Sequence, residues 1–498
     1  MYTSHNISHE ILIYLPKKYI PQEYIPEEVS LMRASVQKYR ERIVRGPIVR
    51  TLFQLALPLI IVQLIQISYN VADAFWLSMY SDTAVAVPRQ AWPPFLFFSA
   101  ISMALSSSNL ALISQYIGAR DSKSASEVAS KFFTVSVLAG LTFGGAYFVL
   151  RPLIFTYIVR VPAELYDQVV AYAAVMSVVM ALSYLVTAYS TILQSVGDTK
   201  RPALVNAAYL LLNTVLDPLF IFGVGPFPRL GVVGAVVTDL VGNILSVITL
   251  ALIAEKTLPD LEIRLTRSID FHWIVLNLKI GLPILVLVLS NSTAKMLQLR
   301  LVNTFGVVAA TAYSLGFIAI DLSDATLRGL SRATAIMTGQ NLGAGLFRRA
   351  REIALKAAAL VFTLTLVGAA TLYVFRDPFI SVFIQDPAIH AETRRLLEIL
   401  LWSLPFFGVM LTAMFVGRGS GHTLPPTLIG IVRLWGFWVG LGYMLACFMK
   451  YGSTGVWTAM ALGNVITGLV ALMWLKYGDW THPVIGTRMP LRMCSQPK

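Results

Sequence analysis

The chain has 498 residues, of which 56% are hydrophobic and only 13% are charged, and its mean hydropathy is +0.69. A soluble domain of this length would carry about a quarter charged residues, because a surface that faces water needs them. The composition therefore excludes an ordinary soluble protein and indicates one that crosses a membrane many times. The net charge of +13 would suit a nucleic-acid-binding protein, but its placement in loops is better explained by anionic lipid headgroups.

Apolar runs of about 20 residues, the length that crosses a bilayer, occur in two groups of six. The first group covers about residues 51–78, 84–113, 128–150, 168–194, 202–223 and 231–254. The second covers about residues 272–304, 308–338, 352–375, 396–416, 424–447 and 454–476. The sequence therefore predicts an all-α polytopic membrane protein with twelve transmembrane helices.

The basic residues between these runs are distributed unevenly. They are concentrated before the first run, in every second loop after it, and in the tail. By the positive-inside bias, both termini are expected in the cytoplasm, in a plasma or inner membrane. Residues 1–31 contain no run of membrane length and Met32 precedes a basic segment, so we expect residues 1–31 to be a dispensable extension.

The two groups of runs repeat each other at a nearly constant offset. The motif "ISQYIGAR" (113–120) is matched by "TGQNLGAG" (338–345), and "SVGDTKRPALV" is matched by "GSGHTLPPTLI". Six spans is an even number, so the copies start on the same membrane side as parallel repeats. We expect the following organisation: 1–45 N-terminal cytoplasmic extension, 46–254 first lobe, 255–271 cytoplasmic linker, 272–478 second lobe, and 479–498 cytoplasmic tail.

Three carboxylates interrupt the apolar runs of the first lobe: Asp73, Asp217 and Asp239. At 1.5 Å rise per residue, Asp73 lies roughly 34 Å and Asp217 roughly 24 Å from the N-terminal side, and Asp239 roughly 13 Å from the opposite side. All three are therefore expected in the outer half of the membrane, where they can face one chamber. Asn213 lies one helical turn before Asp217 and shares its face.

Buried carboxylates of this kind are rare in membranes and usually functional. Pro218 removes a backbone donor next to Asp217 and is expected to kink the helix. Asp73, Asn213 and Asp217 are therefore candidates for exchanging protons or holding a small cation such as Na⁺. The remaining candidates for the cavity are Tyr172, Thr187, Thr238 and Asp239. A structural acid paired within the bundle, and hydroxyls that only pack helices, are the alternatives.

The second lobe has no counterpart of the first-lobe acids. At the repeat offset, Asn213 and Asp217 correspond to Phe437 and Leu441, and Asp73 corresponds to Gln298. Its own buried polar residues are Lys295, Gln298, Arg300, Asp321, Asp324 and Arg328. The ion pairs Asp324–Arg328 and Lys295–Asp321 are expected, so we interpret this set as a structural polar network. The central seam is expected to be acidic, with Arg433 as the main exception.

The sequence contains no motif that indicates an enzyme. The two cysteines and six histidines form no metal-ligand set, and no nucleophile–base motif lies within a span. We therefore expect no enzyme, no cofactor and no bound metal other than a transported Na⁺. Two lobes that rock about a seam suit a monomeric carrier of small organic molecules, in contact with lipid and without nucleic acid.

The chain resembles the multidrug and toxic compound extrusion (MATE) family. The resemblance covers about residues 33–480 and is carried by "RTLFQLALPLI", "YNVADAFWLS", "GRGSGHTLPP" and, most specifically, "GDTKRPALVNAAYLLLNTVLDPLFIFGVGPFPRLGVVGA". It implies a V of two lobes with a central cleft and cation-coupled export of organic compounds. It also implies coupling roles for Asp73, Asn213 and Asp217, and associated polar roles for Tyr172 and Thr238.

Two positions depart from the family pattern. Thr187 stands where relatives often have Asn, which leaves its role open. Asn291 replaces a glutamate found in one branch, so the chain looks like the DinF-like branch. The expected function is antiport of lipophilic or cationic drugs and toxins against H⁺ or Na⁺. The alternative is a flippase for lipids or lipid-linked sugars from the same superfamily.

Overall fold

We describe the protein from a computed structural model that covers residues 27–81, 83–259, 261–383 and 386–485. Side chains are described from residue 36 onward within these ranges, apart from 318–326 and 382–383. Most of the expected N-terminal extension and part of the tail therefore lie outside the described residues. So do the side chains of two expected network members, Asp321 and Asp324.

The first half of the chain forms one helical bundle, which we call the first lobe. It is preceded by α2 (Glu27–Arg45). Its elements are α3 (Ile48–Tyr80), α4 (Ala86–Gly118), α5 (Ser122–Leu153), the π-helical turn η3 (Ile154–Ile158), α6 (Ala163–Val196), α7 (Lys200–Phe222) and α8 (Val232–Thr257). Long apolar sequences form helices here because a helix satisfies all of its backbone hydrogen bonds internally, as lipid requires.

The second half forms the second lobe. Its elements are α9 (Phe271–Asn303), α10 (Val307–Gly343), α11 (Phe347–Val374), α12 (Arg376–Phe383), α13 (Pro387–Leu400), the 3₁₀ turn η4 (Leu401–Ser403), α14 (Leu404–Ser420), α15 (Leu424–Ile431), the π-helical segments η5 (Val432–Leu441) and η6 (Met444–Phe448), and α16 (Gly452–Tyr477). Pro58 in α3 and Pro283 in α9 lie inside the first helix of each lobe, at the repeat offset.

Eleven segments of the described chain are long and apolar enough to cross a membrane, and α10 takes the place of the remaining predicted span. The order of the predicted spans is confirmed, although the helices are longer than the apolar runs. The largest difference lies before the predicted span 396–416, where α12 and α13 add helix from Arg376 onward. The buried face of α13, which includes Leu396, Leu397 and Leu400, explains this extension, because packing stabilises a helix whose mean hydropathy is low.

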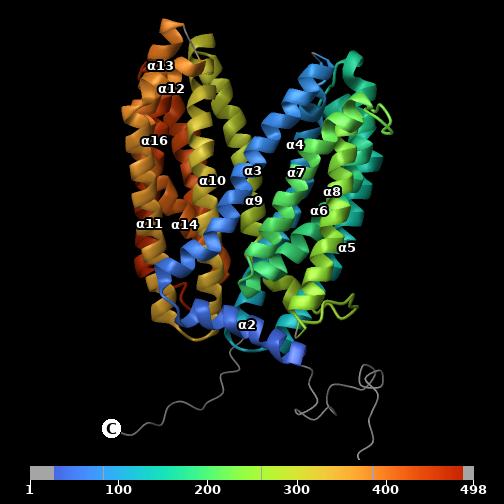
Figure 1. The fold of residues 1–498 in the computed structure, drawn as a ribbon. Coiled ribbons are helices and arrows are strands. Elements are labelled where there is room, and N and C mark those ends of the chain that lie inside the picture. The colour runs from blue at the N-terminus through green and yellow to red at the C-terminus, as the bar shows by residue number, and fades with distance from the viewer. Residues whose placement is uncertain (1–26, 82, 260, 384–385, 486–498) are drawn as a thin grey trace, which may run out of the picture.

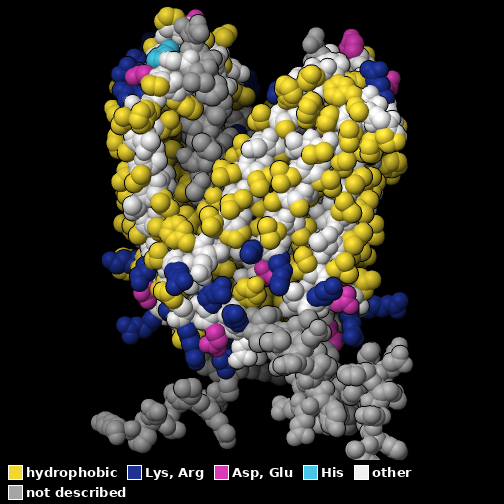
Figure 2. Space-filling view, in the orientation of Figure 1, with side chains coloured by type: hydrophobic (Ala, Val, Ile, Leu, Met, Phe, Trp, Pro, Cys, Tyr) yellow, Lys and Arg dark blue, Asp and Glu magenta, His cyan; other side chains and the backbone are white. Residues whose placement is uncertain are grey.

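The two lobes form a V (Figure 1). They converge at the end where α2 lies, which we call the closed end, and diverge at the opposite, open end. The surface is hollowed between the lobes at the open end, and apolar side chains cover the flanks (Figure 2). Lys and Arg are gathered mainly around the closed end in this view. The lobes touch where α3 packs on α10 and where α9 packs on α4. The two contacts are equivalent in the repeat, because each joins the first helix of one lobe to the second helix of the other.

At the closed end, α4 and α10 approach each other too closely for side chains. A Cβ atom added to Gly118 would lie 2.0 Å from the backbone oxygen of Gln340, and one added to Gly343 would lie 1.8 Å from that of Gln115. These glycines belong to the repeated motif around residues 118 and 343. Their lack of a side chain is what permits the helix ends to meet.

The same contact carries a pair of hydrogen bonds related by the repeat. The Gln115 side-chain amide donates to the backbone oxygen of Ser420 at 3.0 Å. The Gln340 side-chain amide donates to the backbone oxygen of Ser195 at 2.8 Å. Gln115 and Gln340, like Ser195 and Ser420, are 225 residues apart, and all four are buried. Each lobe therefore bonds the other in the same way, and we call these four residues the glutamine latch.

Two peripheral segments cover the latch. From α2, the Arg40 guanidinium donates to the backbone oxygens of Ile117 and Gly118, and the Asn341 amide reaches the backbone oxygen of Ile43. From the segment after α16, the backbone amide of Val484 donates to the Gln115 side-chain oxygen at 2.9 Å. The closed end is thus sealed by the lobes themselves and by the chain on either side of them.

Candidate functional site

A cavity of about 670 Å³ lies within the first lobe. Its walls come from α3, α4, α6, α7 and α8. Four of the predicted site residues line it: Asp73, Tyr172, Thr187 and Asp239. The other three, Asn213, Asp217 and Thr238, are fully buried behind the wall. The expectation that Asp73 and Asp217 are wetted together in one chamber is therefore not met, because only Asp73 lines this cavity.

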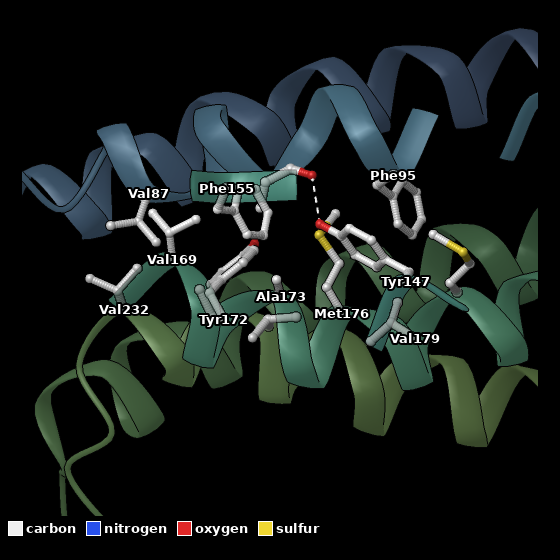
Figure 3. Close-up of a cluster of buried hydrophobic side chains, with 14 of the residues drawn as sticks. Val87, Phe95, Tyr147, Phe155, Val169, Tyr172, Ala173, Met176, Val179 and Val232 are labelled. Carbon is white, nitrogen blue, oxygen red and sulfur yellow. Dashed lines mark hydrogen bonds between the residues drawn. The ribbon is translucent and has the colours of Figure 1, made fainter. Parts of the chain in front are cut away.

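The rear wall of the cavity is an apolar cluster. Tyr172, Met176 and Val179 extend from α6 into a cluster that also contains Phe95 of α4 and Phe155 of η3 (Figure 3). Beside them the Tyr147 hydroxyl donates to the backbone oxygen of Ala91 at 3.0 Å, which ties α5 to α4. This packed wall supports the polar residues opposite, because side chains locked by close packing hold neighbouring groups in position.

Asp239 is the centre of the polar network. One of its carboxylate oxygens, Oδ1, accepts hydrogen bonds from the Tyr69 hydroxyl (3.1 Å), the Tyr209 hydroxyl (2.8 Å) and the Asn213 side-chain amide (2.7 Å). These donors come from α3 and α7, so the carboxylate joins three helices. It is the most extensively bonded of the three acids, because α3 and α7 pack over it, and it still lines the cavity.

Asp217 forms a separate pair with Thr238 of α8. The Thr238 oxygen lies 2.5 Å from Asp217 Oδ1 and 2.6 Å from the backbone oxygen of Ala235. A hydroxyl has one hydrogen and can donate it to only one of these acceptors. When Asp217 is ionised, Thr238 donates to it. When Asp217 carries a proton, it can donate to Thr238, and Thr238 then donates to Ala235. The pair therefore has one hydrogen-bond arrangement for each charge state.

Three acceptor atoms of this site have no hydrogen-bond partner among the described residues. They are Asp73 Oδ1, Asn213 Oδ1 and Asp217 Oδ2, and all three are buried. A buried acceptor without a partner is unfavourable by about 1–3 kcal/mol. Protonation of Asp73 or Asp217, or a small cation beside them, would remove the cost of burying an ionised carboxylate oxygen without a partner. The charges of Asp73 and Asp239 also act on Asp217, so the three acids are electrostatically linked.

The kink at Pro218 remains a prediction, and Pro218 does not interrupt the helix. The α7 helix continues through Pro218 to Phe222. It ends at Gly223, which has the left-handed backbone conformation (φ 73°) typical of helix ends. Asp217 is therefore presented by a continuous helix rather than by an unwound one.

Tyr69, Tyr209 and Asn243 were not identified from the sequence. Asn243 donates to the backbone oxygen of Asp239 at 2.9 Å and approaches the Tyr209 hydroxyl at 3.4 Å. A signal was present, because Tyr69 precedes Asp73 by four residues and Tyr209 precedes Asn213 by four, which places each pair on one helix face. Gly242 makes room for this arrangement, since a Cβ there would lie 1.9 Å from the Tyr209 ring.

The second lobe holds another cavity, of about 830 Å³. Lys295 and Arg328 line it, together with Arg418 and Arg433. The prediction that Arg433 is the main basic residue of the seam is therefore wrong. Sequence reasoning treated Lys295 and Arg328 as members of internal ion pairs and overlooked Arg418, which lies near the end of an apolar run.

The expected polar network of the second lobe does not form a single cluster in the described residues. Lys295 faces the cavity and lies 5.5 Å from the centre of the Phe317 ring. Gln298 is fully buried about one turn further along α9, where it accepts a hydrogen bond from the Tyr313 hydroxyl at 3.1 Å. Arg300 is exposed. The pairings with Asp321 and Asp324 fall on side chains outside the described residues.

Comparison with known proteins agrees with this architecture. The MatE family model matches residues 58–219 and again residues 283–444, once in each lobe. The chain is 26% identical over 412 residues to "Probable multidrug resistance protein YoeA" of Bacillus subtilis (strain 168), covering 80% of this chain and 88% of the relative. It is 24% identical over 439 residues to "FAD transporter" of Shewanella oneidensis, covering 87% and 95%.

Among solved structures, the fold is similar to "Crystal structure of MATE in the bent conformation". The TM-score is 0.80 with 23% sequence identity, over 88% of this chain and 96% of that chain. The family model matches both lobes, which agrees with the twofold arrangement of apolar helices and identifies the family. The chain belongs to the MatE family of multi-pass membrane transporters and is not an enzyme.

Proposed function

We propose that the protein is a proton-coupled antiporter that exports lipophilic organic compounds, and that Asp73 and Asp217 carry the coupling protons. The observation that carries this proposal is the set of buried acceptor atoms on these two carboxyls that have no partner among the described residues. Each carboxyl has one such oxygen, which is what a proton site requires. A bound Na⁺ would instead need several oxygens converging on one point.

Asp239 has a different role in this scheme. Three donors on one oxygen favour its charged form. A fixed negative charge at the cavity wall would attract protons and cationic compounds. Protonation of Asp217 then reverses the hydrogen bond with Thr238, and protonation of Asp73 removes a charge from α3. Loss of this charge allows α3 to bend towards the rear wall and reduce the cavity, which expels a bound compound.

The closed end faces the cytoplasm in this proposal, because the basic residues gather there (Figure 2). The structure is then open to the outside. To open inwards, the lobes must separate at the closed end, which breaks the glutamine latch. The two lobes are so similar at this contact that breaking it requires a rigid-body rotation and no refolding. The replacement of the branch-specific glutamate by Asn291 supports placement in the DinF-like branch.

The substrate class follows from the cavities and from relatives. Relatives are named as multidrug resistance proteins and one as an FAD transporter. The acidic first cavity suits lipophilic cations. A second candidate is a flippase for lipids or lipid-linked sugars, and the observation that favours it is the basic lining of the second cavity. Dye transport without translocation of a fluorescently labelled lipid distinguishes these functions.

The test is ethidium efflux from proteoliposomes, driven in separate experiments by a pH gradient and by a sodium gradient. We expect the pH gradient alone to drive efflux, and Asp73→Asn and Asp217→Asn each to abolish it. Asp167→Asn is the matched control, since Asp167 lines neither cavity. Undiminished efflux in both variants would show that these acids do not carry the coupling protons. Efflux driven by the sodium gradient alone would show that the coupling ion is Na⁺ and not H⁺.

A further inference from the structure

The second cavity carries positive charge at membrane depth and has no role in the proton pathway. Its lining contains four basic residues, Lys295, Arg328, Arg418 and Arg433, and no Asp or Glu among the described side chains. The sequence places two acids, Asp321 and Asp324, nearby on α10. Even with both ionised, the basic residues outnumber them. Burying a basic side chain within a membrane is energetically unfavourable, and such residues usually have a functional role.

Aromatic rings and amides surround these basic groups. The Arg433 guanidinium lies 4.4 Å from the Trp438 ring centre and 4.8 Å from that of Phe407, and its Nη1 donates to Asn464 Oδ1 at 3.2 Å. Arg418 lies 4.6 Å from the Phe415 ring centre. Rings hold a guanidinium in position without neutralising its charge. The Phe415 ring therefore leaves the positive charge of Arg418 in place.

The local backbone also distinguishes this cavity. Arg433 and Trp438 belong to η5, where the helix widens to a π-helix. π-Helical turns inside α-helices are rare and are frequent at functional sites. The wider turn changes the direction of side chains that would otherwise follow the α-helical spacing of α15. Arg433 is thereby almost fully buried while it still lines the cavity.

The rest of the lining is apolar. It includes Leu287, Phe317, Met414, Leu434 and Met460, and α4 of the first lobe adds Phe97 and Met103. A volume of about 830 Å³ accommodates a molecule of several fused rings. The cavity thus offers a large apolar surface with positive charge and amide donors on its second-lobe wall.

From this arrangement we propose that the second-lobe cavity binds an amphipathic organic anion, with its carboxylate, sulfonate or phosphate group on Lys295, Arg418 and Arg433 and its apolar rings on the aromatic lining. The first lobe would then bind protons and cations while the second binds anions. Export of this ligand depends on the function proposed above, whereas its binding does not. The soluble anion and an anionic lipid share this headgroup chemistry.

The experiment measures binding by purified full-length protein in a neutral maltoside detergent, without any gradient. Fluorescein and rhodamine 123 serve as probes because both are xanthene dyes of similar size, the first anionic and the second cationic. Fluorescence anisotropy gives the Kd of each. We expect fluorescein to bind, and Lys295→Gln to weaken it by about tenfold, the effect of one charge-assisted contact. Rhodamine 123 should be unaffected by this variant.

Arg300→Gln is the matched control, because Arg300 lies on the same helix as Lys295 but is exposed and does not line the cavity. Lys295 is exposed within the structure, so its replacement leaves the packed core intact. Arg433→Lys, which retains the charge, should preserve more binding than Arg433→Gln. Equal loss with Arg300→Gln, or fluorescein binding that Lys295→Gln leaves unchanged, would overturn the proposal. Absence of fluorescein binding would do the same.

Two competition experiments identify the source of the anion. Displacement of fluorescein by soluble naphthalene-2-sulfonate supports a water-soluble substrate, and displacement by phosphatidylglycerol in mixed micelles supports a lipid. Displacement by neither would overturn the anion site. If fluorescein binds but the pH gradient does not drive ethidium efflux, the proton-coupling proposal is wrong and the proposal of an anion site in the second lobe still holds. If the pH gradient drives ethidium efflux but fluorescein does not bind, the anion-site proposal is wrong and the proposed antiport function still holds.

Discussion

The helix α7 of the first lobe and the segment α15–η5–η6 of the second occupy the same place in the two repeats, yet they differ in shape and charge. The former is α-helical to Phe222, and the latter contains two π-helical stretches, Val432–Leu441 and Met444–Phe448. Tyr209 and Arg433 are 224 residues apart, so an arginine in one lobe takes the position of a tyrosine in the other. Asn213 and Asp217 are replaced by Phe437 and Leu441.

The partner helix is conserved between the lobes although the chemistry is not. In the first lobe, Asn243 of α8 approaches the Tyr209 hydroxyl at 3.4 Å. In the second, the equivalent Asn464 of α16 accepts from Arg433 at 3.2 Å. The repeat thus retains an asparagine as the contact between two helices and changes the group that it contacts. The two lobes therefore share one helical scaffold, but the first-lobe cavity is lined by acidic residues and the second-lobe cavity by basic residues.

After the two proton-carrying acids, the largest effect is expected from Asp239→Asn, which tests whether the first lobe depends on a fixed negative charge. Hydrogen bonds to a charged group are each worth about 1.5–3 kcal/mol, and three donors lose their charged acceptor. We expect pH-driven ethidium efflux to fall by about a hundredfold. Asp167→Asn again serves as control. Efflux within a factor of two of the unmodified protein would show that Asp239 is only structural.

A smaller effect is expected from Thr238→Val, which keeps the shape of the side chain and removes the hydroxyl next to Asp217. Without this hydroxyl, neither charge state of Asp217 keeps its bond to Thr238, so we expect about a tenfold loss of efflux. The change should alter the pH dependence of efflux and leave dye binding in the second lobe intact. Thr214→Val on α7 is the control, because its hydroxyl bonds only a backbone oxygen within its own helix.

Gln340→Ala and Gln115→Ala test the similarity of the lobes at the glutamine latch. Gln340→Ala removes its hydrogen bond to Ser195 across the closed end, worth about 1 kcal/mol, whereas Gln115→Ala removes the bond to Ser420 and also the one from the Val484 amide. We expect either variant to shift the population towards the inward-open state by a few-fold, with a somewhat larger shift for Gln115→Ala. Distances between spin labels at the closed end would measure this shift. Strongly unequal effects would show that the latch is not functionally symmetric, and no effect would exclude it as a latch.

The smallest effect concerns a turn whose ionisable residues differ between the two lobes. Asp198 pairs with Arg201 at 2.9 Å, whereas its counterpart His422 lies 2.8 Å from His482. Burial, followed by the His482 charge, lowers the pKa of His422 from 6.5 to about 4. Because the unfolded chain binds this proton more tightly, stability is retained above pH 6.5 and is lost as pH falls towards 4.

His422→Asn should therefore reduce the loss of stability between pH 7 and pH 5, by about 1 kcal/mol after allowance for screening by water. Thermal unfolding of the purified protein at both pH values measures the difference. Lys279 lowers the same pKa and Asp479 raises it, so both charges contribute to the midpoint. An identical pH dependence in the variant would exclude His422 as the responsible group.

Much of this protein follows from its sequence because lipid restricts the choices. A segment that spans the hydrocarbon must be long, apolar and helical, so the spans and their order could be read directly. The repeat offset revealed two similar lobes. The high cost of a buried charge singled out Asp73, Asp217 and Asp239 before any contact was known.

The contacts between helices required the tertiary structure. Nothing in the sequence places Tyr69 of α3 and Tyr209 of α7 on the same oxygen of Asp239, or separates Asp217 from the cavity that Asp73 lines. The four basic residues of the second cavity lie on four different elements and converge only when these pack together. Helix formation is a local response to the solvent, whereas the rotation and approach of each helix depend on side chains that are distant in the chain.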